Sequence, residues 1–130
     1  MRILNFSIAT SLCLFLATAS AEPQKQGQHD PCANAQTTAE MRDCAGQEYQ
    51  KADAALNKSY RELMAKLDDE GQKSVLKTAQ QAWIKYRDAN CEFAAYQNRG
   101  GTIYPVVYTG CLTSTTTART KELVQMLKDN

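Results

Sequence analysis

The sequence has little of what a chemically active site needs. It contains a single His, His29, and no Cys-x-x-Cys or His-x-x-x-His pair that could hold zinc. A serine–histidine–aspartate catalytic triad is not expected, because His29 lies in a polar segment ahead of the first predicted helix. The paired glycines Gly100 and Gly101 are not followed by the Lys-Ser/Thr of a phosphate-binding loop. We therefore expect no catalytic residue, no metal, no cofactor and no enzymatic activity.

The chain also lacks an excess of charge of one sign. It has 130 residues, of which 15 are basic and 14 acidic, and its formal net charge is +1. An electrostatically driven nucleic-acid binder needs a concentrated basic surface, so that class is excluded. The length allows one small domain. The expected partner is a protein.

The first 21 residues are typical of a secretory signal peptide. Met1-Arg2 is a short basic start, residues 3–17 form an apolar run, and Ala19-Ser20-Ala21 has the small-x-small form of a cleavage site. The run is too short for a membrane anchor. Cys13 follows Leu12, whereas a lipidation site has a small residue there. We predict cleavage after residue 21, a product that is neither lipidated nor membrane-anchored, and a periplasmic or secreted location.

After cleavage, the polar residues 22–31 are predicted to be a disordered leader, and residues 32–130 to be the domain. Four Cys remain, an even number that predicts two disulfides in a short exported chain. Cys32 and Cys44 lie on either side of the first helix start, while Cys91 and Cys111 flank the paired glycines. Pairing neighbours is the simplest of three possible connectivities, and the sequence leaves the choice open.

Hydrophobic spacing predicts three helices. Thr37 and Glu40 match a capping box, and apolar residues recur from there to Leu67 at steps of three and four. A second stripe includes Val75, Leu76, Ala79, Ala82, Trp83, Tyr86, Phe93 and Ala94 and ends before Gly100-Gly101. Residues 102–110 are expected to be an irregular connector. A third, shorter helix is expected over residues 114–128, with Met126 among its inward residues. The predicted fold is all-α, a small antiparallel hairpin or bundle of three helices joined by two disulfides.

Several polar residues fall on the predicted inward faces. Asp53 follows Tyr49 by four residues, Arg87 follows Trp83 by four, and Arg119 precedes Leu123 by four. We interpret them as a structural cluster in which Asp53 pairs with Arg87 or Arg119. The alternative, a carboxylate tuned for acid–base work, needs a second carboxylate beside it. The predicted polar and aromatic core consists of Tyr49, Asp53, Asn57, Tyr60, Trp83, Arg87 and Arg119.

The connector is the candidate binding surface. Its ends are tethered if Cys91 pairs with Cys111, and Tyr and Arg are common at interface hot spots. The alternative is that its apolar residues only cover one end of the bundle. The residues predicted to contact a partner are Arg99, Gly100, Gly101, Thr102 and Tyr104.

Three segments together resemble a known family. TAEMRDC at residues 38–44, ADAALN at 52–57 and AWIKYRDANC at 82–91, with the four Cys, look like the LprI-like lysozyme inhibitor family. The resemblance extends from Cys32 to about Leu127. It implies a small exported, disulfide-bonded helical domain whose partner is a lysozyme or another wall hydrolase. The family prototype is a surface lipoprotein, whereas this chain has no lipidation motif, which implies a free periplasmic product.

The resulting hypothesis is a binding protein that blocks a cell-wall muramidase by protein–protein contact. The near-neutral charge offers no acidic surface to steer a cationic lysozyme, so an envelope interaction or immunity-type module with another partner is the alternative. An enzyme acting on wall fragments through Asp53 or Glu40 is a third reading, and it requires a pocket with two carboxylates.

Overall fold

The structure, a computed structural model, describes residues 32–130. The predicted signal peptide (residues 1–21) and leader (residues 22–31), with Cys13 and His29, lie outside the described residues. Within residues 32–130, no helix combines the length and the apolar character needed to cross a membrane.

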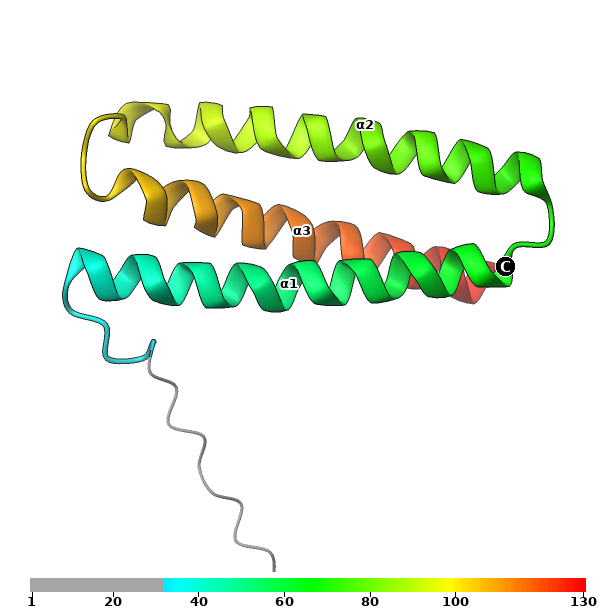
Figure 1. The fold of residues 1–130 in the computed structure, drawn as a ribbon, viewed down its shortest axis with the longest axis horizontal. Helices are drawn as coiled ribbons and strands as arrows, with labels where there is room; N and C mark the ends of the chain where they lie inside the picture. The colour runs from blue at the N-terminus through cyan, green and yellow to red at the C-terminus, as the bar shows by residue number, and fades with distance from the viewer. Residues whose placement is uncertain (1–31) are drawn as a thin grey trace, which may run out of the picture.

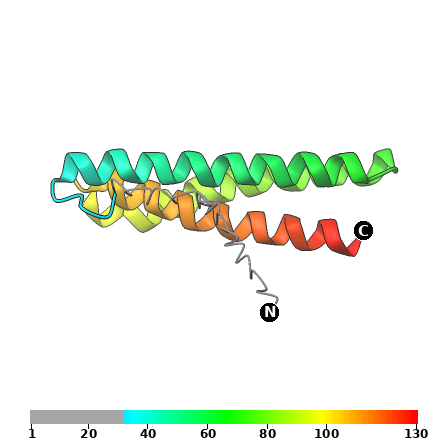
Figure 2. The same cartoon turned by 90° about the horizontal axis from the view of Figure 1, so that it is seen from below.

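Three long helices make up the described part of the chain. They are α1 (Thr38–Lys66), α2 (Glu70–Ala95) and α3 (Tyr104–Asp129), with a 3₁₀ turn, η1 (Tyr96–Asn98), after α2. In Figure 1, α1 and α3 run in the same direction and α2 runs opposite to both. The backbone of α3 packs against both other helices, and Figure 2 shows α3 diverging from α1 toward the C-terminus. The all-α prediction with three packed helices is confirmed.

Side-chain caps define where α1 and α2 begin. The Thr37 hydroxyl accepts from the Glu40 backbone N–H at 3.2 Å, and the Glu40 carboxylate accepts from the Thr37 N–H at 2.9 Å, which completes the predicted capping box. Asp69 caps α2 by accepting from the Gln72 backbone N–H at 2.7 Å. These bonds satisfy donors that the first turn of a helix leaves without a partner.

The third helix is longer than the sequence predicts. It begins at Tyr104 instead of residue 114, so the expected irregular connector over 102–110 is wrong, and only residues 99–103 join η1 to α3. Pro105 lies in the first turn, where a missing N–H costs nothing and the fixed φ suits a helix. Val106 and Val107 are half-buried, and this packing overrides their preference for strands. The helix therefore runs along the bundle as a third long helix.

The core is a narrow column of Leu side chains. Leu56 and Leu63 of α1 meet Leu123 of α3, and Leu63 and Leu123 are no more than 2% exposed. Around this column lie the partly buried Tyr60, Leu76, Trp83 and Leu127.

The inward face of α2 differs from the predicted one. Val75, Tyr86 and Phe93 were expected to be inward, but they are 71%, 61% and 80% exposed. Met126 of α3, also expected to be inward, is 39% exposed. The face of α2 that is buried carries two polar side chains, Gln80 and Arg87, each 7% exposed. The apolar stripe in the sequence was therefore the wrong criterion for the buried face of this helix.

Two disulfides pair neighbouring Cys residues, as in the simplest predicted connectivity. Cys32 bonds Cys44 with a Cα–Cα distance of 5.2 Å, and Cys91 bonds Cys111 with a distance of 5.4 Å. Both bonds lie at the end of the bundle where α1 begins and α2 passes into α3, the left side of Figure 1. We call this end, with residues 91–111 and the start of α1, the connector end.

Candidate functional site

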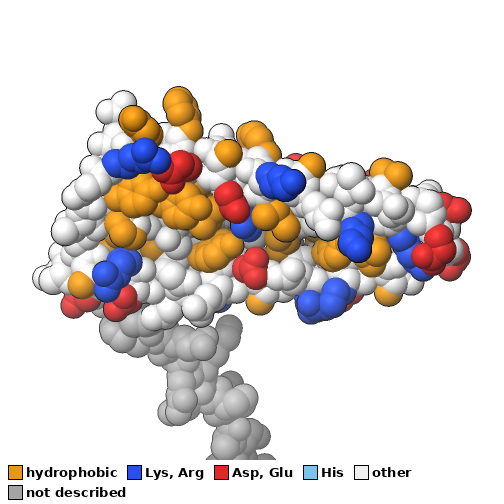
Figure 3. Space-filling view, turned by 45° about the horizontal axis from the view of Figure 1, so that its top comes forward, with side chains coloured by type: hydrophobic (Ala, Val, Ile, Leu, Met, Phe, Trp, Pro, Cys, Tyr) orange, Lys and Arg blue, Asp and Glu red, His pale blue; other side chains and the backbone are white. Residues whose placement is uncertain are grey.

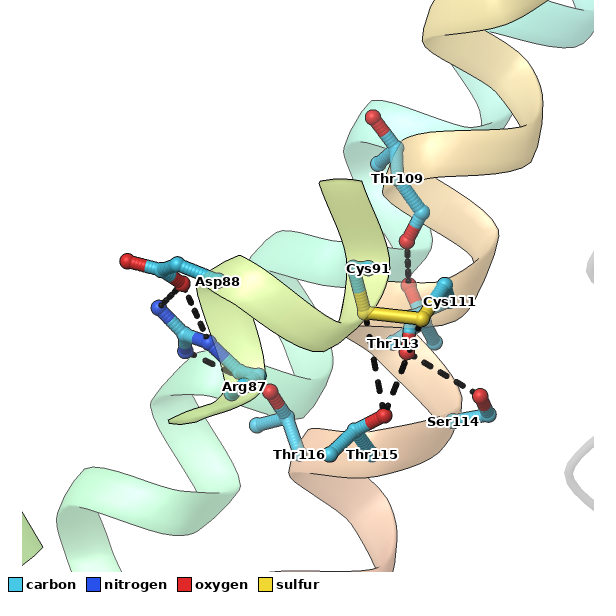
Figure 4. The surroundings of a disulfide bond; sticks show 9 residues. All are labelled: Arg87, Asp88, Cys91, Thr109, Cys111, Thr113, Ser114, Thr115 and Thr116. Carbon is cyan, nitrogen blue, oxygen red and sulfur yellow. Dashed lines mark hydrogen bonds and ion pairs between the residues drawn. A yellow bond between two sulfur atoms is a disulfide. The ribbon is translucent and has the colours of Figure 1, made fainter. Parts of the chain in front are cut away.

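The connector end is held by the bond between Cys91 and Cys111. Cys91 is in the last two turns of α2 and is fully buried, and Cys111 is in the second turn of α3. The Thr115 hydroxyl lies 3.8 Å from the Cys91 sulfur and 3.9 Å from that of Cys111 (Figure 4). The disulfide thus links the end of α2 to the start of α3, close to residues 99–103 that connect them.

The connecting segment turns tightly at its glycines. Gly100 has a φ of 78°, a left-handed conformation that residues with a side chain rarely adopt. The Gly101 N–H donates to the Asn98 carbonyl at 3.0 Å, and the Tyr104 N–H donates to the Gly101 carbonyl at 3.2 Å. The segment is therefore a compact turn, with residues 99–102 exposed.

One carboxylate joins the two sides of this turn. Glu92, near the end of α2, accepts from the Arg99 guanidinium and from the Tyr104 hydroxyl. The hydrogen bond from Tyr104, and to a lesser extent that from Arg99, lowers the pKa of Glu92. The same hydrogen bond to Glu92 is the main cause of the raised pKa of Tyr104. The carboxylate is consequently ionised and the phenol neutral at physiological pH.

Aromatic rings support the same cluster. The Arg99 guanidinium lies 4.6 Å from the centre of the Tyr96 ring, and Tyr104 stacks on Tyr108 with ring centres 6.0 Å apart. The side chain of Arg99 is nevertheless 55% exposed. The cluster presents a positioned but accessible cation at the end of the molecule.

The start of α1 adds a second cation to this end. Arg42 lies across a shallow hollow of about 300 Å³ from Thr102 and Pro105. It is exposed, and its neighbour Asp43 is 3.6 Å from its Nε. The exposed surface of the connector end thus combines guanidinium groups, tyrosines and a glycine turn.

The predicted polar core centres on Arg87, whose surroundings differ from the expectation. The guanidinium lies between the rings of Tyr49 and Trp83, at 5.7 and 5.3 Å from their centres. It pairs with Asp88 at 2.8 Å and donates to the Thr116 hydroxyl at 3.5 Å (Figure 4). These contacts compensate for the desolvation of a buried charge and tie α2 to both neighbours.

The proposed pairing of Asp53 with an arginine is wrong. Arg119 donates to Gln80 at 3.1 Å and pairs with Glu122 at 2.7 Å, and Arg87 pairs with Asp88 as described. Asp53 instead accepts from the exposed Asn57 amide at 2.8 Å. Asp53 and Asn57 lie one turn apart on α1. This local hydrogen bond gives the Asp53 carboxylate a partner, so it needs none from another helix.

Two grooves lie along the helices. One, of about 270 Å³ between α1 and α2, is lined by Asp53, Tyr60, Gln80 and Arg87 among others, and Asp53 is the only carboxylate in it. This groove therefore lacks the carboxylate pair that the wall-fragment enzyme requires. The other, of about 470 Å³, is apolar and is lined by residues that include Leu67, Val75 and Met126. We call this second region, where α1 turns into α2 beside the C-terminus, the open end.

The sequence interpretation missed Glu92 as the centre of the site. Glu92 is seven residues before Arg99 and twelve before Tyr104, on the far side of a helix break. No local spacing rule connects residues across such a break. Finding Glu92 from the sequence would have required knowing which carboxylate of α2 lies close to Arg99 once the chain turns at Gly100.

Comparisons with known proteins give three matches. A family model described as "Lysozyme inhibitor LprI" matches residues 30–123. A protein of Rhizobium meliloti (strain 1021), described as "Uncharacterized protein R02472", is 37% identical over 132 residues, which cover 92% of this chain and 94% of that protein. The crystal structure of a DUF1311 family protein (PP0307) from Pseudomonas putida KT2440 aligns with a TM-score of 0.68 and 24% identity, over 72% of this chain and 97% of that one. This last likeness shows a shared fold.

Proposed function

Since the chain belongs to the LprI lysozyme inhibitor family, a non-enzymatic binding family, we propose that it binds a cell-wall muramidase and blocks its substrate cleft with the connector end. Muramidases cleave glycosidic bonds with a pair of carboxyl groups at the base of a cleft. A protein that fills such a cleft needs a narrow, stiff protrusion that carries a cation. The connector end offers a tight glycine turn, a disulfide behind it and an accessible guanidinium.

The observation that carries the proposal is the half-exposed Arg99 held in place by its neighbours. Its guanidinium is fixed by Glu92 and stacked on Tyr96, so little side-chain freedom is left to lose on binding. A guanidinium presents several N–H donors, and the groups facing solvent can bond a carboxylate of the enzyme. The disulfide behind the turn limits the backbone in the same way.

Local contacts, not long-range attraction, would give the affinity. Without the predicted signal peptide, whose only charged residue is Arg2, the chain has 14 basic and 14 acidic residues. A neutral inhibitor gains no electrostatic steering toward a basic enzyme, so its association rate is expected to be ordinary. Binding should therefore depend strongly on the few residues of the connector end.

The location follows from the same proposal. Disulfides form and persist in oxidising compartments, and the predicted signal peptide would direct the protein to one. We propose that the protein acts in the periplasm or outside the cell, where wall hydrolases work.

A wall-lysis assay tests the proposal. Purified protein is added to several muramidases acting on a suspension of peptidoglycan, and clearing is followed by turbidity. We expect protection by the unaltered protein, and we expect Arg99→Ala to raise the half-protecting concentration at least tenfold, or about 1.4 kcal/mol. Arg61→Ala removes the same charge from an exposed site of α1 near the open end and should have no effect.

Tyr104→Phe refines the assay, because it removes only the hydroxyl that donates to Glu92. It should weaken protection less than Arg99→Ala, since the arginine keeps its own bond to the carboxylate. Absence of protection by the unaltered protein at tens of micromolar, across all muramidases tried, would exclude the inhibitor function. A periplasmic pull-down that retains a different protein through Arg99 would then support the interaction or immunity-type module.

A further inference from the structure

A second surface, on α2, has the form of a helix–helix interface without its partner. Apolar residues recur along the exposed face at alternating steps of four and three, the spacing of a coiled-coil seam. Four of them are large and are 58–80% exposed, and the three alanines between them are also exposed. We call this surface the α2 seam; its residues are Val75, Ala79, Ala82, Tyr86, Ala89, Phe93 and Tyr96.

The α2 seam is separate from the packing that holds the bundle. The buried side of the helix carries Gln80, Arg87 and Cys91, each no more than 7% exposed. In Figure 3, hydrophobic side chains stand out at intervals along the upper edge of the molecule, on the side formed by α2. Scattered exposed apolar residues are normal on a protein surface, but a continuous periodic row over several turns is typical of an interaction face.

We propose that the α2 seam binds the α2 seam of a second copy of this chain, with the two helices antiparallel. The size pattern of the seam argues for this occupant. One antiparallel register sets Ala79 against Tyr96, Ala82 against Phe93 and Tyr86 against Ala89 of the second copy. Each pair of facing residues then joins one aromatic ring to one alanine. The pairs therefore fill similar volumes along the interface, and the two helices can approach closely.

Charge agrees with the same register. Lys85 and Glu92 lie beside the seam, one residue before Tyr86 and Phe93, at positions that flank a coiled-coil interface. The register that pairs each ring with an alanine brings Lys85 close to Glu92 of the second copy, twice by symmetry. The Glu92 carboxylate, which also accepts from Arg99 and Tyr104 of its own chain, would be shared with this lysine. Shifting it by one heptad step in either direction would bring Lys85 toward Lys85, or Glu92 toward Glu92. The charges therefore favour one alignment and disfavour its neighbours.

The seam is also large enough. It spans 22 residues, of which residues 79–96 pair in the proposed register, over about 26 Å at about 1.5 Å per residue. A buried aromatic side chain covers about 150–250 Å², so three per copy supply about half or more of the roughly 800 Å² per partner in a standard interface. A symmetric interface of this kind closes with two copies, which predicts a dimer and not a fibre.

Sedimentation equilibrium of the protein, expressed from its full-length coding sequence and kept oxidised, tests the proposal. We expect a reversible monomer–dimer equilibrium with a micromolar dissociation constant. Phe93→Glu should raise that constant more than tenfold. Ile84→Glu makes the same kind of change on another face of α2 and should leave it within about twofold. Circular dichroism verifies that both variants keep their helices.

A second pair of variants tests the register. Lys85→Glu places two like-charged pairs in the proposed dimer and should weaken it several-fold, whereas Lys77→Glu makes the same charge change off the seam and should not. Equal effects of the two lysine variants would overturn the antiparallel register. A dimer that Phe93→Glu does not weaken, or a protein that stays monomeric at millimolar concentration, would overturn the interface itself.

The α2 seam and the cluster around Arg99 share Tyr96, and Glu92 beside the seam holds Arg99, but Phe93 belongs to the seam and not to that cluster. Variants of Phe93 and Arg99 therefore separate self-association from the proposed inhibition. If the unaltered protein is monomeric and Phe93→Glu abolishes protection in the wall-lysis assay, the seam faces the enzyme, and the proposed dimer is overturned. If Phe93→Glu dissociates a dimer and protection is unchanged, the dimer is supported and the connector end remains the inhibitory surface.

Discussion

The two ends of the bundle are held together in different ways. The connector end is fixed by two disulfides and by stacked tyrosines. Glu92 adds two hydrogen bonds there, one from Arg99 and one from Tyr104. At the open end, the contacts include the Asp69 cap, the Lys66 ammonium on the Leu127 carbonyl at 2.9 Å, and the packing around an apolar groove. The connector end is therefore braced by covalent bonds, whereas the open end is held by caps and packing.

The thin core explains why bracing is needed. Three Leu residues form the buried cluster, and small domains with little apolar burial commonly depend on covalent links. A disulfide lowers the entropy of the unfolded chain and can hold a surface turn without adding bulk to it. Covalent bracing at one end therefore leaves the outer face of the connector end free for binding.

The largest expected effect comes from removing the brace. Cys91→Ala with Cys111→Ala opens a crosslink that spans 20 residues, and we expect a loss of about 3 kcal/mol in the free energy of unfolding. Urea denaturation followed by circular dichroism measures the loss. The double variant Cys32→Ala and Cys44→Ala is the control. It frees only the short segment before α1, so we expect a smaller loss, and an equal loss would show that the two disulfides brace the domain alike.

A smaller effect is expected at the open end. Leu67 caps the C-terminus of α1, is 9% exposed and lines the apolar groove. Leu67→Ala should cost about 2 kcal/mol, at the low end for a buried Leu, because the groove already gives the neighbours room to adjust. Urea denaturation checks this value. Val75→Ala lines the same groove from a 71% exposed position and should change stability by less than about 0.5 kcal/mol.

The sequence predicted those features of the fold that have a local chemical cause. The start of α1 follows from the Thr37 and Glu40 capping box, and the glycine turn follows from the conformational freedom of Gly100. Both disulfides follow the simplest connectivity. The start of α3 was missed because Ile103 makes no side-chain cap and the first turn is rich in β-branched residues. That start depends on tertiary packing, which local rules do not contain.

The faces of α2 show the second limit of sequence reading. The helix carries two competing stripes, and the more apolar one, with Val75 and Phe93, faces outward. The buried stripe contains Gln80 and Arg87. Gln80 accepts from Arg119 of α3, while Arg87 pairs with its neighbour Asp88 and donates to Thr116 of α3. Hydrophobic periodicity cannot identify a face whose polar groups are satisfied by distant partners. The candidate binding surface stays a prediction, and the sequence outlined it without Glu92 because that carboxylate lies beyond a helix break.

The smallest expected effect is the response of the connector end to pH. The pKa of Glu92 is lowered in the folded protein, so its bonds to Tyr104 and Arg99 contribute fully above the ordinary carboxyl range and are lost as the pH falls through the lowered pKa. The pKa of Tyr104 is raised, so its contribution is present below the ordinary phenol range and is lost as the pH rises through the raised pKa. The connector end should thus be most ordered between these limits. Carbon-detected NMR of the Glu92 carboxyl should give a titration midpoint below the ordinary range of a glutamate carboxyl.

The amide protection factors of residues 99–104 should fall as the pH falls through that midpoint, while amides of the open end keep their protection. Glu92→Gln is the matched control, because it keeps an acceptor oxygen but cannot ionise. It should remove the acid-dependent change in the connector end and leave the rest of the exchange profile unchanged. If the unaltered protein and Glu92→Gln lost protection at the same pH, the order of the connector end would come from its disulfide and glycine turn, and the carboxylate would have no part in it.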